Sequence, residues 1–148
     1  FNNPKKYSGG LGGNETTFGT ALTYSGAPVK VNQLNFHIRH NGYKRISFEA
    51  NLYEIKEGGV TGRINPSPIL FGVENIKNWV TAELSTPVTI SSDVLVTLKV
   101  VDGDAKERSV GLLLSHDDSS YKTMEELTGQ KDWGIWEGNF SFYLSHRE

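Results

Sequence analysis

The segment that most constrains the fold is residues 78–101, NWVTAELSTPVTISSDVLVTLKVV. Its first part has apolar residues at every second position, the pattern of a strand with one buried face. A Pro-containing turn follows at residues 85–87. Residues 94–101 then carry apolar side chains on both faces, as a central strand does. We therefore predict two strands here, with the second in the middle of a sheet.

The rest of the chain repeats the pattern of short strands separated by Gly, Pro and Asn turns. The cleanest alternation lies in residues 45–56. In residues 29–40 the apolar set changes parity between Val31 and Leu34, so we expect a β-bulge near Asn32-Gln33. The strand candidates are residues 16–24, 29–40, 45–56, 69–76, 79–84, 94–101, 110–114, 133–136 and 140–145, the last two forming a closing hairpin.

These strands predict an all-β protein, specifically an antiparallel, jelly-roll-like β-sandwich with about nine or ten strands. A closed barrel is the structural alternative. The 148 residues suit one domain with a core that needs no disulfide or metal. We assign residues 16–148 to that domain and residues 1–15 to a Gly-rich N-terminal leader. Because the chain begins at Phe1 rather than Met, we expect it to be a processed or excised segment.

Composition excludes several classes of function. Fifteen basic and seventeen acidic residues give a net charge of −2, which favours neither nucleic-acid binding nor a polybasic membrane patch. No apolar run approaches the ~18 residues of a transmembrane helix. The absence of Cys excludes disulfides and thiolate chemistry.

The common catalytic motifs are absent, and we predict that the protein is not an enzyme. There is no G-x-S-x-G, no P-loop and no H-E-x-x-H. The run Ser115-His116-Asp117 has triad residue types, but a triad is defined by geometry and not by adjacency. A glycosidase with Glu49 and Glu83 as its two carboxylates is a less favoured alternative. The two carboxylates could lie close enough together if their strands are neighbours.

We predict no cofactor, and a structural calcium ion is left open. Two acidic loops supply oxygen ligands of the kind that calcium prefers. The first contains Asp102, Asp104 and Glu107, and the second contains Asp117 and Asp118. Turn formation by Asp is the alternative explanation.

Two aromatic groupings are the candidate ligand sites. The first is a polar surface with Tyr53 and Trp79 as stacking rings, which forms if three strands share one sheet. An ordinary solvated face is its alternative. The residues of this surface are His37, Arg39, Glu49, Asn51, Tyr53, Trp79, Thr81 and Glu83.

The second grouping lies at one end of the predicted sandwich. Residues 116–131 leave one strand and enter another. We therefore expect Asp117, Asp118 and Tyr121 to lie near Trp133 and Trp136. The alternative is that the two Trp side chains close the end of the core.

The order of strands also resembles a known family. The segments FGTALTY, VNQLNFHI, RISFEANLYEI, NPSPILFGVENI, NWVTAELSTPVTI and DVLVTLKVV cover most of residues 18–101. They resemble an uncharacterised β-sandwich module of Bacteroidota cell-envelope and surface proteins that is often found with carboxypeptidase-regulatory-like domains. The resemblance implies an exported or cell-surface location and a non-catalytic role.

We therefore expect a secreted or surface-located binding module whose partner is a glycan or another surface ligand, including a protein. The alternative is a structural or assembly domain that contacts neighbouring domains or copies of itself through exposed strand edges.

Overall fold

The computed structural model of the chain describes residues 4–12, 17–41, 45–74, 79–103, 109–115, 139–140 and 142–147. Every helix or strand assigned within these ranges is a β-strand, which confirms the all-β prediction. The strands are β1 (Pro4–Gly12), β2 (Thr17–Leu22), β3 (Val29–Asn41), β4 (Arg45–Lys56), β5 (Gly59–Arg63), β6 (Ile69–Glu74), β7 (Trp79–Ile90), β8 (Asp93–Gly103), β9 (Ser109–Ser115), β10 (Asn139–Phe140) and β11 (Phe142–Ser145).

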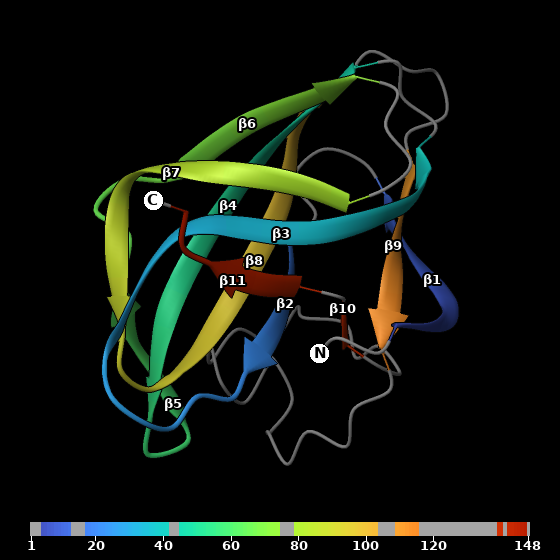
Figure 1. Cartoon of the computed structure of the whole chain (residues 1–148). Coiled ribbons are helices and arrows are strands. Elements are labelled where there is room, and N and C mark those ends of the chain that lie inside the picture. Colours follow the sequence, from blue (N-terminus) through green and yellow to red (C-terminus); the bar gives the residue numbers. More distant parts are fainter. Residues whose placement is uncertain are drawn as a thin grey trace.

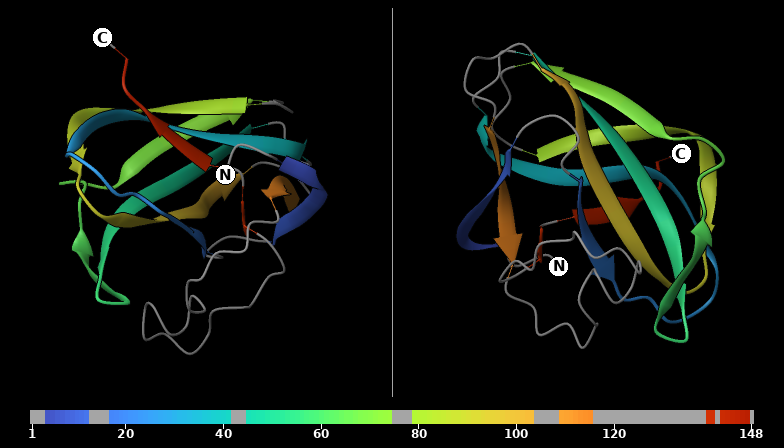
Figure 2. Two further views of the ribbon diagram at one scale, coloured as in Figure 1. Left: turned by 60° about the horizontal axis from the view of Figure 1, so that its bottom comes forward. Right: turned by 180° about the vertical axis from the view of Figure 1, so that it is seen from behind.

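The strands form two antiparallel sheets. The first sheet has six strands in the order β1-β9-β3-β11, with β7 also paired to β3 and β10 to β9. The second has five strands in the order β2-β8-β4-β5, with β6 also paired to β4. In Figure 1, β7, β3 and β11 lie side by side, and β4 and β8 cross behind them at a steep angle. Figure 2 shows the paired strands β4 and β8 from behind.

Two strands were not expected. Residues 4–12, which we assigned to a leader, form β1 and pair with β9. Residues 59–63, which we read as part of an irregular connection, form a hairpin with β4. Its turn has positive φ at Glu57 (52°) and Gly58 (76°), as a two-residue type I′ turn requires. Within the described residues, eleven strands are therefore assigned where we predicted nine or ten for the whole chain.

The expected β-bulge is present in β3. Its pairing with β7 shifts register between Val31 and Gln33. The shift lets Val31, Leu34 and Phe36 all lie in the core despite their different parity. The bulge at Asn32 is therefore confirmed.

The predicted turn at residues 85–87 is instead a bend within β7. Gln33 pairs with Glu83 and Val31 with Val88, so four residues of β7 lie opposite Asn32 alone. Figure 1 shows β7 curving downward along the side of the molecule. A Pro at residue 87 is compatible with a strand here because β7 is an edge strand, where a missing N–H breaks no ladder.

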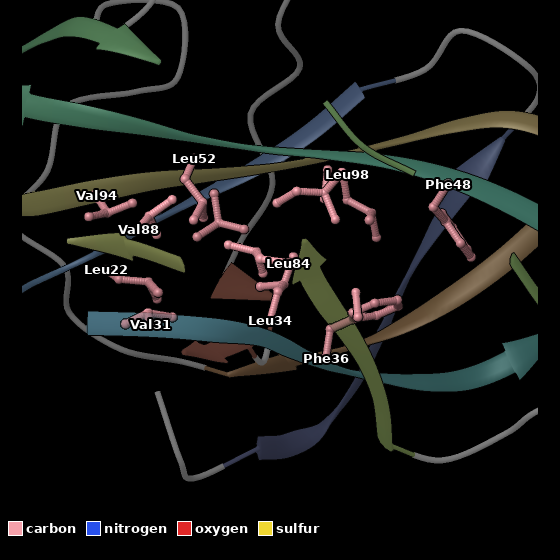
Figure 3. Packing of buried hydrophobic residues seen from close by; sticks show 14 of the residues in the cluster. Leu22, Val31, Leu34, Phe36, Phe48, Leu52, Leu84, Val88, Val94 and Leu98 are labelled. Atoms are coloured by element: carbon pink, nitrogen blue, oxygen red, sulfur yellow. The ribbon is translucent and has the colours of Figure 1, made fainter. Parts of the chain in front are cut away.

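The core contains buried side chains from both sheets in one cluster (Figure 3). Three aromatic rings link the sheets, with Phe36 on β3, Phe48 on β4 and Phe71 on β6. Phe36 lies 5.7 Å from Phe48 and 5.5 Å from Phe71 between ring centroids, and Phe48 stacks on Phe71 at 5.4 Å. The packing of these rings joins β3 of the first sheet to β4 and β6 of the second.

As predicted, β8 is a central strand, between β2 and β4. Val94, Val96 and Leu98 belong to the main core. Leu95 faces the other way and is 1% exposed in a second small cluster. Val101 is partly exposed, so the apolar character of this second face does not extend along the whole strand.

The predicted closing hairpin is only partly described. Its second half corresponds to β10 and β11, which pair with β9 and β3 respectively. Residues 133–136 lie outside the described residues. Across the part of the chain that the structure describes, no helix has the length and apolar character of a membrane span.

Candidate functional site

The outer face of β3 and β7 is the best-defined polar surface of the described residues. Because strand side chains alternate, the neighbours of the core residues on these strands face away from the core. The two strands contribute three register pairs to this surface, which we call the β3–β7 outer face. The pairs are His37 with Trp79, Asn35 with Thr81, and Gln33 with Glu83.

A series of four hydrogen bonds runs across this face from the Thr81 hydroxyl to the Glu83 carboxylate. Thr81 Oγ1 donates to Asn35 Oδ1 at 2.7 Å, and Asn35 Nδ2 donates to Ser145 Oγ at 2.9 Å. Ser145 Oγ donates to Gln33 Oε1 at 3.0 Å. Gln33 Nε2 then donates to Glu83 Oε1 at 3.2 Å. The donors all point the same way, so each bond polarises the next, and the carboxylate is held at the end of the chain.

Trp79 lies at the opposite end of the same face. Its ring packs edge-on against the His37 imidazole, with 5.4 Å between centroids and an interplanar angle of 89°. The residue is 40% exposed. Trp79 and Glu83 are four residues apart on β7, which is ~13 Å along a strand. The face therefore presents an aromatic ring and a carboxylate at the spacing of a short linear ligand.

A cleft of about 230 Å³ adjoins the carboxylate end of this face. It lies between the β5–β6 connection and the bend of β7. Glu83 is the one charged residue among its ten lining residues, and Leu70 at its edge is 69% exposed. The lining residues are Asn65, Pro66, Ser67, Pro68, Ile69, Leu70, Glu83, Leu84, Ser85 and Thr86.

One side chain anchors the wall of the cleft that comes from the second sheet. Asn65 is 3% exposed. Its Oδ1 accepts a hydrogen bond from the Leu52 N–H at 2.8 Å. Its Nδ2 donates to Asn51 Oδ1 at 3.1 Å and to the Ser67 carbonyl at 2.7 Å. The connection that carries Pro66 and Pro68 is therefore fixed to β4.

Tyr53 and Trp79 do not share a face. Tyr53 is on β4 in the second sheet, where it packs against the cluster of Ala21, Ile55 and Leu95. The prediction that polar residues of β3, β4 and β7 form one surface was therefore wrong. Alternation in the sequence indicates which residues face out, but not which sheet a strand joins.

The glycosidase interpretation required neighbouring strands for Glu49 and Glu83. Their strands, β4 and β7, belong to different sheets, so the pair is not assembled in the way that this interpretation needs. Among the residues that the structure describes, no three His, Asp or Glu side chains are grouped to hold a metal ion. Asp104, Glu107 and Asp117 lie outside the described residues, so the calcium alternative is not tested by them.

The second aromatic grouping stays a prediction. Asp118, Tyr121, Trp133 and Trp136 all lie outside the described residues. Of the six predicted ligand-binding residues, Trp79 alone is both described and part of the β3–β7 outer face.

Four residues of the site were not predicted, namely Gln33, Asn35, Asn65 and Ser145. Gln33 and Ser145 come together only because β11 pairs with β3, and no local pattern specifies that pairing. Asn65 carries a local signal, since an Asn in a Pro-rich turn commonly binds nearby backbone groups. Its bonds to β4 depend on the fold.

No protein-family model matches this sequence, and comparisons with curated proteins and with solved structures return no significant match.

Proposed function

We propose that the protein is a non-catalytic carbohydrate-binding module and that the β3–β7 outer face, with its cleft, is the binding site. A partly exposed Trp ring offers its apolar surface to the C–H groups of a sugar. A small number of fixed polar groups then provides orientation and specificity. Secretion or a cell-surface location remains part of the proposal, since it follows from the family resemblance in the sequence.

The observation that carries this proposal is that Trp79 and Glu83 lie on the same face of β7. Both side chains belong to one strand and one face, and the polar groups between them are held by hydrogen bonds to one another. An already ordered surface loses little conformational entropy when it binds a ligand. Sugar hydroxyls can donate to the carboxylate while a second sugar unit stacks on the ring.

We further propose that the two sheets form a β-sandwich of the jelly-roll type. The chain crosses between the sheets at most of its connections. The order β1-β9-β3-β7 in one sheet and β2-β8-β4-β6 in the other interleaves early and late strands. Two Greek keys wound together generate such an interleaved order, and lectin domains use it. The main core cluster, which has residues from both sheets, supports the same arrangement.

The binding proposal predicts that Trp79→Ala weakens glycan binding. Loss of one stacking ring should reduce affinity about tenfold, because an aromatic contact contributes about 0.5–1.5 kcal/mol beyond its area burial. Isothermal titration calorimetry of the wild-type chain against a panel of soluble polysaccharides identifies a binder, and the variant is then titrated with it. Val101→Ser is the matched control because Val101 is similarly exposed but lies on β8. No binding across the panel, or equal binding by the Trp79→Ala variant, contradicts the proposal.

The second candidate is a structural or assembly role. Its support is the edge strand β6, which among the described strands pairs with β4 alone and which exposes Leu70. An open edge with an exposed apolar side chain can accept a strand from another chain. Light scattering at high protein concentration tests self-assembly, and a strict monomer argues against that form of it.

A further inference from the structure

We infer that Glu83 makes the site selective for neutral and amino sugars over acidic sugars. This inference rests on the proposed function and concerns the cleft end of the β3–β7 outer face. Glu83 supplies the one charge among the residues that line the cleft. An ionised carboxylate accepts hydrogen bonds and does not donate them. A hydroxyl or ammonium group of a ligand can therefore bind it, whereas a ligand carboxylate cannot.

A hydrogen bond from Gln33 orients the Glu83 carboxylate. Gln33 Nε2 donates to Glu83 Oε1, and Gln33 is itself held by Ser145 Oγ. Ser145 in turn accepts from Asn35, which is 2% exposed. Hydrogen bonds thus link the Glu83 carboxylate to side chains of β3 and β11. Rotation of the carboxylate breaks a charge-assisted hydrogen bond, a stronger type than a neutral one.

Arg63 is a basic side chain that bonds backbone carbonyls of two lining residues from outside the cleft. Arg63 Nε donates to the Asn65 carbonyl at 3.1 Å, and its Nη2 donates to the Pro66 carbonyl at 3.3 Å. Arg63 is not among the lining residues. The other polar lining groups, Ser67, Ser85 and Thr86, carry hydroxyls that accept or donate without regard to ligand charge. Among the lining residues, Glu83 is therefore the one that can select a ligand by its charge.

Ser145 acts as a positioning residue for this selection. Its hydroxyl links Asn35 to Gln33 and lies on the last strand of the chain, far in sequence from Glu83. Replacement by Ala removes the link and lets the Gln33 amide and the carboxylate reorient together. We expect this change to reduce discrimination without removing the charge.

The test uses matched oligosaccharide triplets of gluco, galacto and manno configuration, each as the neutral hexose, the 2-amino sugar and the uronate. Isothermal titration calorimetry of the full chain gives the affinity ratio of the neutral to the uronate member. We expect the wild-type protein to bind the uronate about tenfold more weakly, as repulsion between two carboxylates at contact distance implies. Glu83→Gln should bring the ratio close to one, because the amide can donate to the uronate.

Two further variants separate charge selection from a general structural effect. Glu49→Gln makes the same change of charge on the second sheet and should leave the ratio unchanged. Ser145→Ala should lower the ratio about two- to threefold, in line with one neutral hydrogen bond. Ser145→Thr keeps a hydroxyl at this position and should have the wild-type ratio. Thermal melts of all variants show whether each one is folded.

The outcomes distinguish this inference from the proposed function. If no triplet binds, the carbohydrate-binding proposal is wrong and the inference fails with it. If a triplet binds and the wild type does not disfavour the uronate, the inference alone is overturned. The same holds if Glu83→Gln retains the wild-type discrimination. The inference is supported if the preference for the neutral sugar over the uronate disappears in Glu83→Gln but not in Glu49→Gln.

Discussion

Asn65 holds one wall of the cleft with three hydrogen bonds from a single short side chain. Two of its partners, the Leu52 N–H and the Asn51 side chain, lie on β4 and are buried. A buried donor that loses its partner cannot turn to water, so such a loss costs more than the average hydrogen bond. The shape of the cleft therefore depends on one residue that does not need to contact a ligand.

We predict that Asn65→Ala lowers the free energy of unfolding by about 1–3 kcal/mol, because the Leu52 N–H is left buried and unpaired. Urea denaturation measures the change. Ser67→Ala is the control, since Ser67 is exposed and takes part through its backbone carbonyl. It should stay within about 0.5 kcal/mol of the wild type. Equal stability of the two variants would show that the Asn65 hydrogen bonds make no net contribution to the free energy of unfolding.

At the scale of elements, the bulge in β3 has two effects. It lets Val31 and Leu34 both lie in the core, and its Asn32 side chain binds the backbone of Arg147. Asn32 sits at the register shift, so its side chain is not part of the regular alternation. Its Nδ2 donates to the Arg147 carbonyl, and its Oδ1 accepts from the Arg147 N–H, both at 2.8 Å. The amide side chain thus imitates a strand and continues the β3–β11 pairing beyond Ser145.

We predict that Asn32→Ala releases this anchor. The Arg147 amide should exchange with solvent about 5- to 30-fold faster, as expected for a local loss of about 1–2 kcal/mol. Hydrogen exchange followed by NMR at the Arg147 amide measures it. Lys30→Ala, an exposed position on the same strand, should leave that exchange rate unchanged. An unchanged rate in Asn32→Ala contradicts the anchor.

At the scale of the whole molecule, the two sheets share one buried cluster. Leu34 on β3 and Leu98 on β8 are both fully buried in it. Among the side chains that the structure describes, neither sheet has a separate main core, although the second sheet has a small cluster on its other face. Because the main cluster takes side chains from both sheets, each sheet exposes its inner face if the other unfolds. We therefore expect the described strands to unfold together.

We predict that Leu34→Ala and Leu98→Ala each destabilise the whole molecule by about 2–5 kcal/mol, the usual cost of a Leu-to-Ala change in a core. Far-UV circular dichroism and tryptophan fluorescence should report a single coincident transition for each variant. Val29→Ala, at an exposed position of β3, serves as the control with a change of about 0.5 kcal/mol or less. Two separated transitions would contradict a shared core.

Several features were predictable from local pattern alone. Period-two alternation identified β3, β4, β7 and β8, and the parity change between Val31 and Leu34 required the bulge that the structure has. The apolar residues on both faces of β8 indicated a central strand. These features depend on which residues must avoid water, and this information is contained in a few consecutive positions.

Other predictions failed because they depended on which strands become neighbours. Tyr53 and Trp79 carry the same local signal, yet β4 joins the second sheet and β7 the first. A Pro at residue 87 signals a turn, but on an edge strand it is also compatible with a bend. Residues 4–12 have a turn-like composition, yet they form the strand β1 because they pair with β9.

The sequence by itself determined an all-β chain, the inward and outward sides of its main strands, and Trp79 as an outward-facing ring. Alternation on each strand is a local consequence of the hydrophobic effect. The tertiary structure decided that Trp79 shares its face with Glu83 and Ser145 and not with Tyr53. Sheet membership and pairing are set by contacts between residues distant in sequence, and such contacts leave no periodic signal in any one strand.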